Sequence, residues 1–230
     1  MTAPLGQRIA AAPGPRDPGH VVVAAESGRL TRADIAALAP AVPAGARVAV
    51  CLADPLVLIR TLAALDGHAA ALLLLTAGIA PDTLAALAET AGCDRVVTDR
   101  ADIPGALTPD QAIAAGPAGA VPAAGAATEW MMTTSGTTGL PKIVPHTLDS
   151  LARTVRHAPL DRAPVWGLVL EPTRFAGLQV VLQALLGGGT LAVAPQRMGL
   201  ADEIAWLAES GVTHLSATPT LWRRILMAPG

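Results

Sequence analysis

Short apolar runs alternate along the first hundred residues with longer segments in which apolar residues recur every three or four positions. The runs have the length of buried strands, and the segments between them have the period of helices. Strands that alternate with helices in this way are typical of parallel βαβ units, so we expect an α/β fold with mostly parallel layered sheets flanked by helices. The predicted strands cover residues 21–23, 47–52, 70–75 and 96–98, and the predicted helices cover residues 32–39, 54–66 and 81–91.

The same alternation resumes after residue 129. The last predicted helix begins at Pro219 and carries Leu221, Trp222, Ile225 and Leu226 on one stripe. We expect this stripe to be an exposed apolar face that self-association or a companion segment covers. The other predicted elements of this part are strands at residues 165–170, 190–194 and 212–215, and helices at residues 148–157, 175–186 and 200–210.

Changes in composition divide the chain into four parts. Residues 1–20 are rich in Ala, Pro and Gly, so we expect a loosely held N-terminal lead-in. Residues 21–100 form the first βα layers, and residues 101–128 form a low-complexity connector of Ala, Gly and Pro. Residues 129–230 hold the second series of strands and helices.

The overall composition narrows the class of protein. The sequence is 52% hydrophobic but only 2% aromatic, so its core must be aliphatic. A net charge of −2 gives no reason to expect nucleic acid or an anionic membrane as a partner. Cys51 and Cys93 are isolated, which is typical of ordinary buried thiols. Neither a membrane span nor a signal peptide is visible, so we expect a cytoplasmic protein.

The richest polar segment is a run of hydroxyls and glycines over residues 131–142. Apolar residues precede and follow it, which predicts a strand, a loop and a second strand. Glycines let the backbone turn its N–H groups toward an anion, hydroxyls donate adaptable hydrogen bonds, and Lys142 adds a positive charge. The run therefore suits a phosphate chain, although a plain hairpin loop has the same composition. It is not a Walker A loop, because no Gly-Lys-Ser/Thr follows the first glycine at the required distance.

This run resembles, position by position, the phosphate-loop signature of the acyl-adenylate-forming superfamily. That superfamily contains AMP-binding acyl- and aryl-CoA ligases and the adenylation domains of nonribosomal peptide synthetases. Segments 30–35, 47–50, 188–191 and 212–220 are also similar to family segments, in the same order around the loop. The residues that match the loop signature are Thr134, Ser135, Gly136, Thr137, Thr138, Gly139, Pro141 and Lys142.

The resemblance implies the N-terminal part of the adenylate-forming fold and a two-step reaction. A carboxylate attacks the α-phosphorus of ATP to give an acyl-AMP, and a thiol of CoA or of a carrier-protein phosphopantetheine then takes the acyl group. The cofactor-binding residues implied are Thr134 and Lys142 with the loop between them. Mg²⁺ would arrive with ATP, since we find no protein metal site. No residue is assigned a catalytic role, because the family's catalytic lysine lies near the far C-terminus.

The resemblance also places one wall of the acyl pocket at the start of the predicted helix 175–186. Phe175, Ala176 and Gly177 would line that wall, although Phe175 could equally be a core anchor. Segment 173–183 holds no acidic residue, so we expect an aryl or simple acyl acid without an α-ammonium group as substrate. His146, in a segment similar to that of aryl-acid ligases, is a further candidate, with a surface histidine as the alternative.

Members of the superfamily continue well beyond the length seen here. The resemblance therefore implies an adenylation domain truncated after residue 230, inactive without a companion C-terminal half. The partners expected are a small carboxylic acid together with that half, a carrier protein or a second copy. A different class remains open, in which the chain is a non-catalytic nucleotide-binding or scaffold module that pairs with a partner protein.

Overall fold

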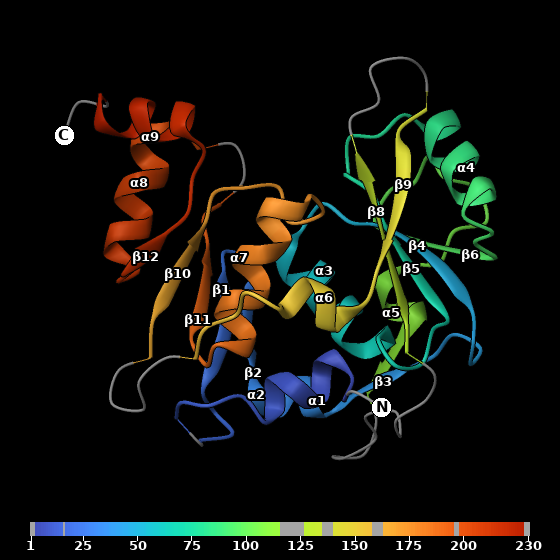
Figure 1. Ribbon diagram of the computed structural model, residues 1–230, viewed down its shortest axis with the longest axis horizontal. Coiled ribbons are helices and arrows are strands. Elements are labelled where there is room, and N and C mark those ends of the chain that lie inside the picture. The colour runs from blue at the N-terminus through green and yellow to red at the C-terminus, as the bar shows by residue number, and fades with distance from the viewer. Residues whose placement is uncertain are drawn as a thin grey trace.

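Two five-stranded sheets face each other across a layer of helices (Figure 1). The helices α3, α6 and α7 lie between the sheets, while α4 covers the outer face of one sheet and α8 that of the other (Figure 1). This arrangement confirms the predicted α/β class with mostly parallel sheets flanked by helices. The computed structural model describes residues 3–15, 17–115, 127–134, 140–157, 163–195 and 198–227.

The first sheet has the strand order β6-β4-β5-β8-β9. Apart from Arg47 at the start of β4, the residues of its central strands β4 and β5 are apolar and buried, as parallel strands covered by helices require. Only the edge strand β9 runs antiparallel. Asp54 caps α3 by accepting a hydrogen bond from the Leu56 N–H at 2.8 Å, and Pro55 begins the helix. The elements are β4 (Arg47–Cys51), α3 (Pro55–Leu65), β5 (Ala71–Leu74), α4 (Pro81–Thr90), β6 (Arg95–Thr98), β8 (Glu129–Thr134), β9 (Lys142–His146) and α6 (Leu148–Ala152).

The second sheet joins the start of the chain to its end. Its order is β12-β10-β11-β1-β2, and only β2 runs antiparallel. Within the described residues no side chain of α9 is buried, and Leu226 is 80% exposed, in line with the predicted exposed stripe. The elements are β1 (Val21–Ala25), β2 (Gly28–Thr31), α2 (Arg32–Ala36), β10 (Val165–Leu168), α7 (Phe175–Leu186), β11 (Thr190–Val193), α8 (Leu200–Glu209), β12 (His214–Leu215) and α9 (Pro219–Leu226).

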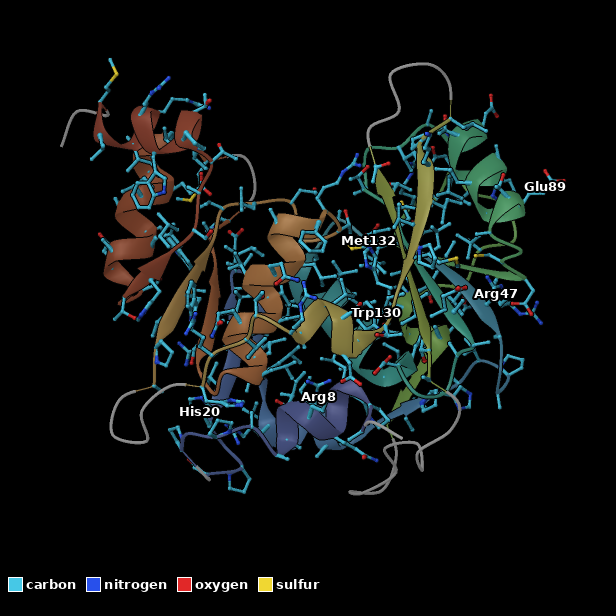
Figure 2. The ribbon with its side chains drawn as sticks, viewed as in Figure 1. Arg8, His20, Arg47, Glu89, Trp130 and Met132 are labelled. Carbon is cyan, nitrogen blue, oxygen red and sulfur yellow. The ribbon has the colours of Figure 1, made fainter. Side chains whose placement is uncertain are left out.

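The start of the chain is packed and not the loose lead-in that its composition suggests. Residues Leu5–Ala10 form helix α1, in which Leu5 is 2% and Ile9 is 0% exposed. Arg8 on α1 forms an ion pair with Asp149 on α6 at 3.0 Å (Figure 2). Burial of two large apolar side chains outweighs the low helix propensity of the surrounding Pro and Gly residues.

The predicted connector over residues 101–128 also holds regular structure. Pro109–Ala112 form the short helix α5, and Ile113–Ala115 form strand β7, which pairs antiparallel with β3 (Leu38–Pro40). Residues 116–126 lie outside the described part of the chain. The strand β3 replaces the end of the helix predicted over residues 32–39, because pairing with β7 satisfies its backbone groups.

None of the helices in the described part of the chain combines the length and the apolar character that crossing a bilayer requires.

Asp66, at the end of α3, joins three parts of the fold from a buried position. Its carboxylate accepts hydrogen bonds from the Leu5 main-chain N–H at 2.7 Å and from the Trp130 indole N–H at 2.8 Å. Asp66 is 3% exposed and Trp130 is fully buried, so neither donor could turn to water instead. The carboxylate therefore ties the N-terminal helix to β8, the strand before the predicted phosphate loop.

Replacing Asp66 with alanine should lower the free energy of unfolding by about 2 kcal/mol. The substitution leaves two donors buried without a partner, and removing the buried carboxylate recovers part of that cost. Chemical denaturation of the variant beside wild type measures the difference. Asp82→Ala, at an exposed position of α4, is the matched control and should stay within about 0.5 kcal/mol of wild type. Equal stability of the two variants would contradict this role for Asp66.

The cost of Asp66→Ala should depend on pH. Burial raises the pKa of the Asp66 carboxyl above its ordinary value, against the opposing effect of its hydrogen bonds. Because of this raised pKa, the folded chain holds the proton of Asp66 more tightly than the unfolded chain does. The resulting contribution of Asp66 to the free energy of unfolding is fully present below about pH 4 and declines as pH rises through the raised pKa. The stability difference between wild type and Asp66→Ala should therefore be larger at acid than at neutral pH. A difference that grows with pH would contradict the assignment.

Candidate functional site

The predicted strand, loop and strand correspond to the hairpin β8–β9. The two strands pair antiparallel, with Thr134 opposite Lys142 and Thr133 opposite Ile143. Thr134 and Lys142 are both exposed at the mouth of the hairpin. The remaining predicted phosphate-loop residues, Ser135, Gly136, Thr137, Thr138 and Gly139, lie outside the described residues.

The hairpin is anchored by the apolar part of β8. Trp130 and Met132 pack into the larger core cluster between the sheets, and Met131 packs into the smaller cluster under α4. Figure 2 shows Trp130 and Met132 on the side of the sheet that faces α6 and the centre of the molecule. Because all three side chains are buried, this part of β8 is a rigid base for the more exposed residues that follow.

The start of α7 reaches the end of β8. Arg174, the residue before the helix, donates from Nη1 to the Thr133 carbonyl oxygen at 3.2 Å and to the Thr133 hydroxyl at 3.3 Å. These two residues lie far apart in the sequence, and no local pattern in either segment signals the contact. Within the predicted wall segment, residues 173–183, Arg174 is the one charged residue.

The rings of Phe175 and His146 form a second contact between α7 and the hairpin. Their centroids are 6.0 Å apart and their planes are inclined at 44°. Phe175 is 55% exposed, so it is not a core anchor. An exposed aromatic ring beside an imidazole offers an apolar surface with a polar edge, which suits contact with an acyl or aryl group.

The other two predicted wall residues differ in exposure. Ala176 is exposed beside Phe175, whereas Gly177 is buried. A Cβ at position 177 would clash with the Glu171 carbonyl oxygen and lie 2.5 Å from its carbon. Gly177 therefore lets the chain before α7 pass close to the helix, and so it fixes where its neighbours Phe175 and Ala176 lie.

Glu171 is the acidic residue nearest in sequence to this wall. Its carboxylate accepts hydrogen bonds from the Thr173 hydroxyl at 2.8 Å and from the Thr173 N–H at 3.3 Å. Glu171 and Pro172 also line a cavity of about 250 Å³ together with residues of β10 and the segments after β4 and β11. The carboxylate thus stabilises the turn that leads into α7.

The largest of the cavities described for this chain region does not contribute to the candidate site. A cavity of about 980 Å³, lined by Ala10, Pro13, Arg32 and His157 among others, lies beside α1 and α2 and not at the hairpin. The Arg32 guanidinium there donates to three main-chain carbonyls, which is a structural role. Within the part of the chain that the structure describes, no group of three or more His, Cys, Asp or Glu side chains could hold a metal ion.

Comparison with known proteins identifies the family of the chain that carries this hairpin. A family model described as AMP-binding enzyme matches residues 36–230. No curated protein sequence matches the chain.

Three solved structures share the fold. The first is o-succinylbenzoate CoA synthetase from Bacillus subtilis with an acyl-adenylate intermediate, which is 19% identical with a TM-score of 0.72, and the match covers 99% of this chain and 65% of that one. The second is the NpsA N-terminal subdomain from Klebsiella oxytoca, which is 20% identical with a TM-score of 0.76, and the match covers 96% of this chain and 62% of that one. The third is the N-terminal domain of FACL13 from Mycobacterium tuberculosis, which is 20% identical with a TM-score of 0.75, and the match covers 99% of this chain and 66% of that one. The chain thus spans less than two thirds of the length of each of the three.

Proposed function

Because the chain belongs to the AMP-binding enzyme family, we propose that it supplies the phosphate loop and one acid-pocket wall of an ATP-dependent carboxylic acid ligase. In the proposed first step, a carboxylate oxygen attacks the α-phosphorus of ATP, the bond from that phosphorus to the bridging oxygen breaks, and pyrophosphate leaves. In the second step a thiol of CoA or of a carrier-protein phosphopantetheine attacks the acyl carbon and releases AMP.

One observation carries this proposal. The start of α7 meets the hairpin through the contact of Arg174 with Thr133 and that of Phe175 with His146. These contacts support the proposal, because through them the first residues of α7 lie beside the end of β8, the strand before the predicted phosphate loop. A reaction between a carboxylate and a phosphate needs such adjacency, because holding both reactants together lowers the entropic part of the barrier.

In this proposal, the predicted site residues divide between contacts to the phosphates and contacts to the acyl group. Lys142 and Thr134, at the mouth of the hairpin, would contact the β- and γ-phosphates with Ser135, Gly136, Thr137, Thr138 and Gly139. Phe175 and Ala176 would contact the acyl group. Magnesium would enter bound to ATP, and it would offset phosphate charge. We assign no catalytic lysine to the described residues.

Exchange of labelled pyrophosphate into ATP tests the proposal. The chain is assayed over a panel of aryl, fatty and amino acids, both alone and mixed with a polypeptide that supplies the rest of the family fold. We expect acid-dependent exchange only in the mixture, because the chain spans less than two thirds of two of its structural relatives. Absence of exchange with every acid, although the mixture binds ATP, would instead support a non-catalytic nucleotide-binding module.

A further inference from the structure

One cation of the candidate site is paired only with neutral oxygens. The Arg174 guanidinium uses a single nitrogen, Nη1, for both of its hydrogen bonds to Thr133. A guanidinium carries five N–H donors in a planar fork, so Nε and Nη2 remain available. None of the ion pairs between described residues includes Arg174. An exposed arginine held in place without a carboxylate is suited to bind an anion from outside the chain.

The position of Arg174 narrows the source of that anion. Its partner, Thr133, immediately precedes Thr134, the exposed residue at the hairpin mouth. Its neighbour along the chain, Phe175, contacts His146 on the opposite strand. The guanidinium therefore lies where the strand entering the phosphate-loop segment meets the proposed acid wall.

Arg174 does not stabilise the helix α7 in the ways that a residue at a helix N-terminus usually does. It occupies the N-cap of α7 but makes no side-chain hydrogen bond to the helix. Its positive charge is at the helix N-terminus, which is the end that disfavours a cation. It is exposed, so it buries little surface of its own. The two hydrogen bonds to Thr133 join the start of α7 to β8 but use only one nitrogen of the guanidinium, so the rest of its fork can bind an anionic ligand.

We infer that Arg174 binds a ligand oxyanion, either the carboxylate of the acid or an oxygen of the polyphosphate, while Thr133 holds its guanidinium in position. This inference rests on the proposed function and adds one residue to it. Both ligands present the same chemistry to a guanidinium, which is a pair of oxygens in one plane. The contact with Thr133 orders the arginine beforehand, so less side-chain entropy is lost on binding.

Titration calorimetry of the 230-residue chain separates the two sources. One arm uses sodium tripolyphosphate and the other uses benzoate. Arg174→Gln should weaken binding of at least one of these probes by about fivefold, since a charged hydrogen bond is lost at an exposed site. Thr133→Val, which removes only the hydroxyl contact, should weaken the same probe by about twofold. Arg29→Gln, at an exposed position of β2, is the matched control and should leave both affinities unchanged.

Salt dependence distinguishes a direct charge from a structural effect. Affinity of wild type should fall more steeply with salt than affinity of Arg174→Gln, because the variant has lost one charge that salt screens. Thermal unfolding without ligand should occur at the same temperature in both. Equal binding of both probes by wild type and Arg174→Gln, or a loss of affinity with unchanged salt dependence, would overturn the inference and leave the proposed function standing. If wild type bound neither probe, the inference would be overturned, whereas the proposed function is decided separately by pyrophosphate exchange in the mixture.

Discussion

Replacing Gly177 with alanine should lower the free energy of unfolding by about 3 kcal/mol, near the upper end for a single added methyl group. The new Cβ would lie 2.5 Å from the Glu171 carbonyl carbon and 3.0 Å from Pro172 Cα. Both are main-chain atoms, which cannot turn aside as a flexible side chain would. The chain before α7 would therefore have to move, and the Arg174 and Phe175 contacts with it.

Chemical denaturation of Gly177→Ala beside Gly78→Ala measures this effect. A Cβ added at Gly78 would meet no heavy atom within 4 Å, so this substitution should change stability by less than about 0.5 kcal/mol. In the exchange assay, Gly177→Ala should also lose activity at temperatures where it is still folded, because its displaced segment carries the proposed acid wall. Equal stability of the two variants would contradict this prediction and would show that the segment before α7 can move at little cost in free energy.

Acids without an α-ammonium group should be activated at least about a hundredfold better than amino acids. A buried ammonium without a counter-charge costs on the order of 3–5 kcal/mol, which corresponds to that factor or more. Segment 173–183 holds no acidic residue, and its one charge, Arg174, repels an ammonium. The nearest carboxylate in sequence, Glu171, already accepts two hydrogen bonds from Thr173.

The exchange assay with the completed fold provides the comparison. Benzoate-like and fatty acids are compared with the proteinogenic amino acids at equal concentration. A matched pair of similar size, such as phenylpropionate and phenylalanine, isolates the ammonium group. Clear preference for any amino acid would contradict the prediction and would direct attention to an acidic group on another wall of the pocket. Arg174→Gln should narrow the ratio within the matched pair, since it removes the repelling charge.

Much of the fold could be predicted from local pattern. The period of apolar residues located α7 over the same residues that the structure shows, and α3, α4 and α8 to within a few residues. The hydroxyl and glycine run predicted the hairpin that β8 and β9 form. These features are decided by neighbours within a few positions, where propensity, capping and turn chemistry act.

The helix predicted over residues 148–157 is shorter in the structure, where α6 ends at Ala152. Two other predictions that differ from the structure, the loosely held lead-in and the low-complexity connector, share one cause. The helix α1 and the strand β7 lie in segments of weak propensity, and each is formed because a distant partner covers it. The Leu5 N–H reaches Asp66, and β7 pairs with β3. Composition alone gives the low propensity of these segments and does not indicate that Asp66 or β3 will pair with them.

The sequence by itself determined most of the strands and helices and the phosphate-loop signature, and it suggested the residues of the proposed acid wall. Only the tertiary structure decided which of them meet. It brings Arg174 to Thr133 and Phe175 to His146, across 41 residues in the first case, and it buries Gly177 against Glu171. The reason is that periodicity encodes which face of an element is apolar, whereas contacts between elements depend on how the two sheets pack across α7.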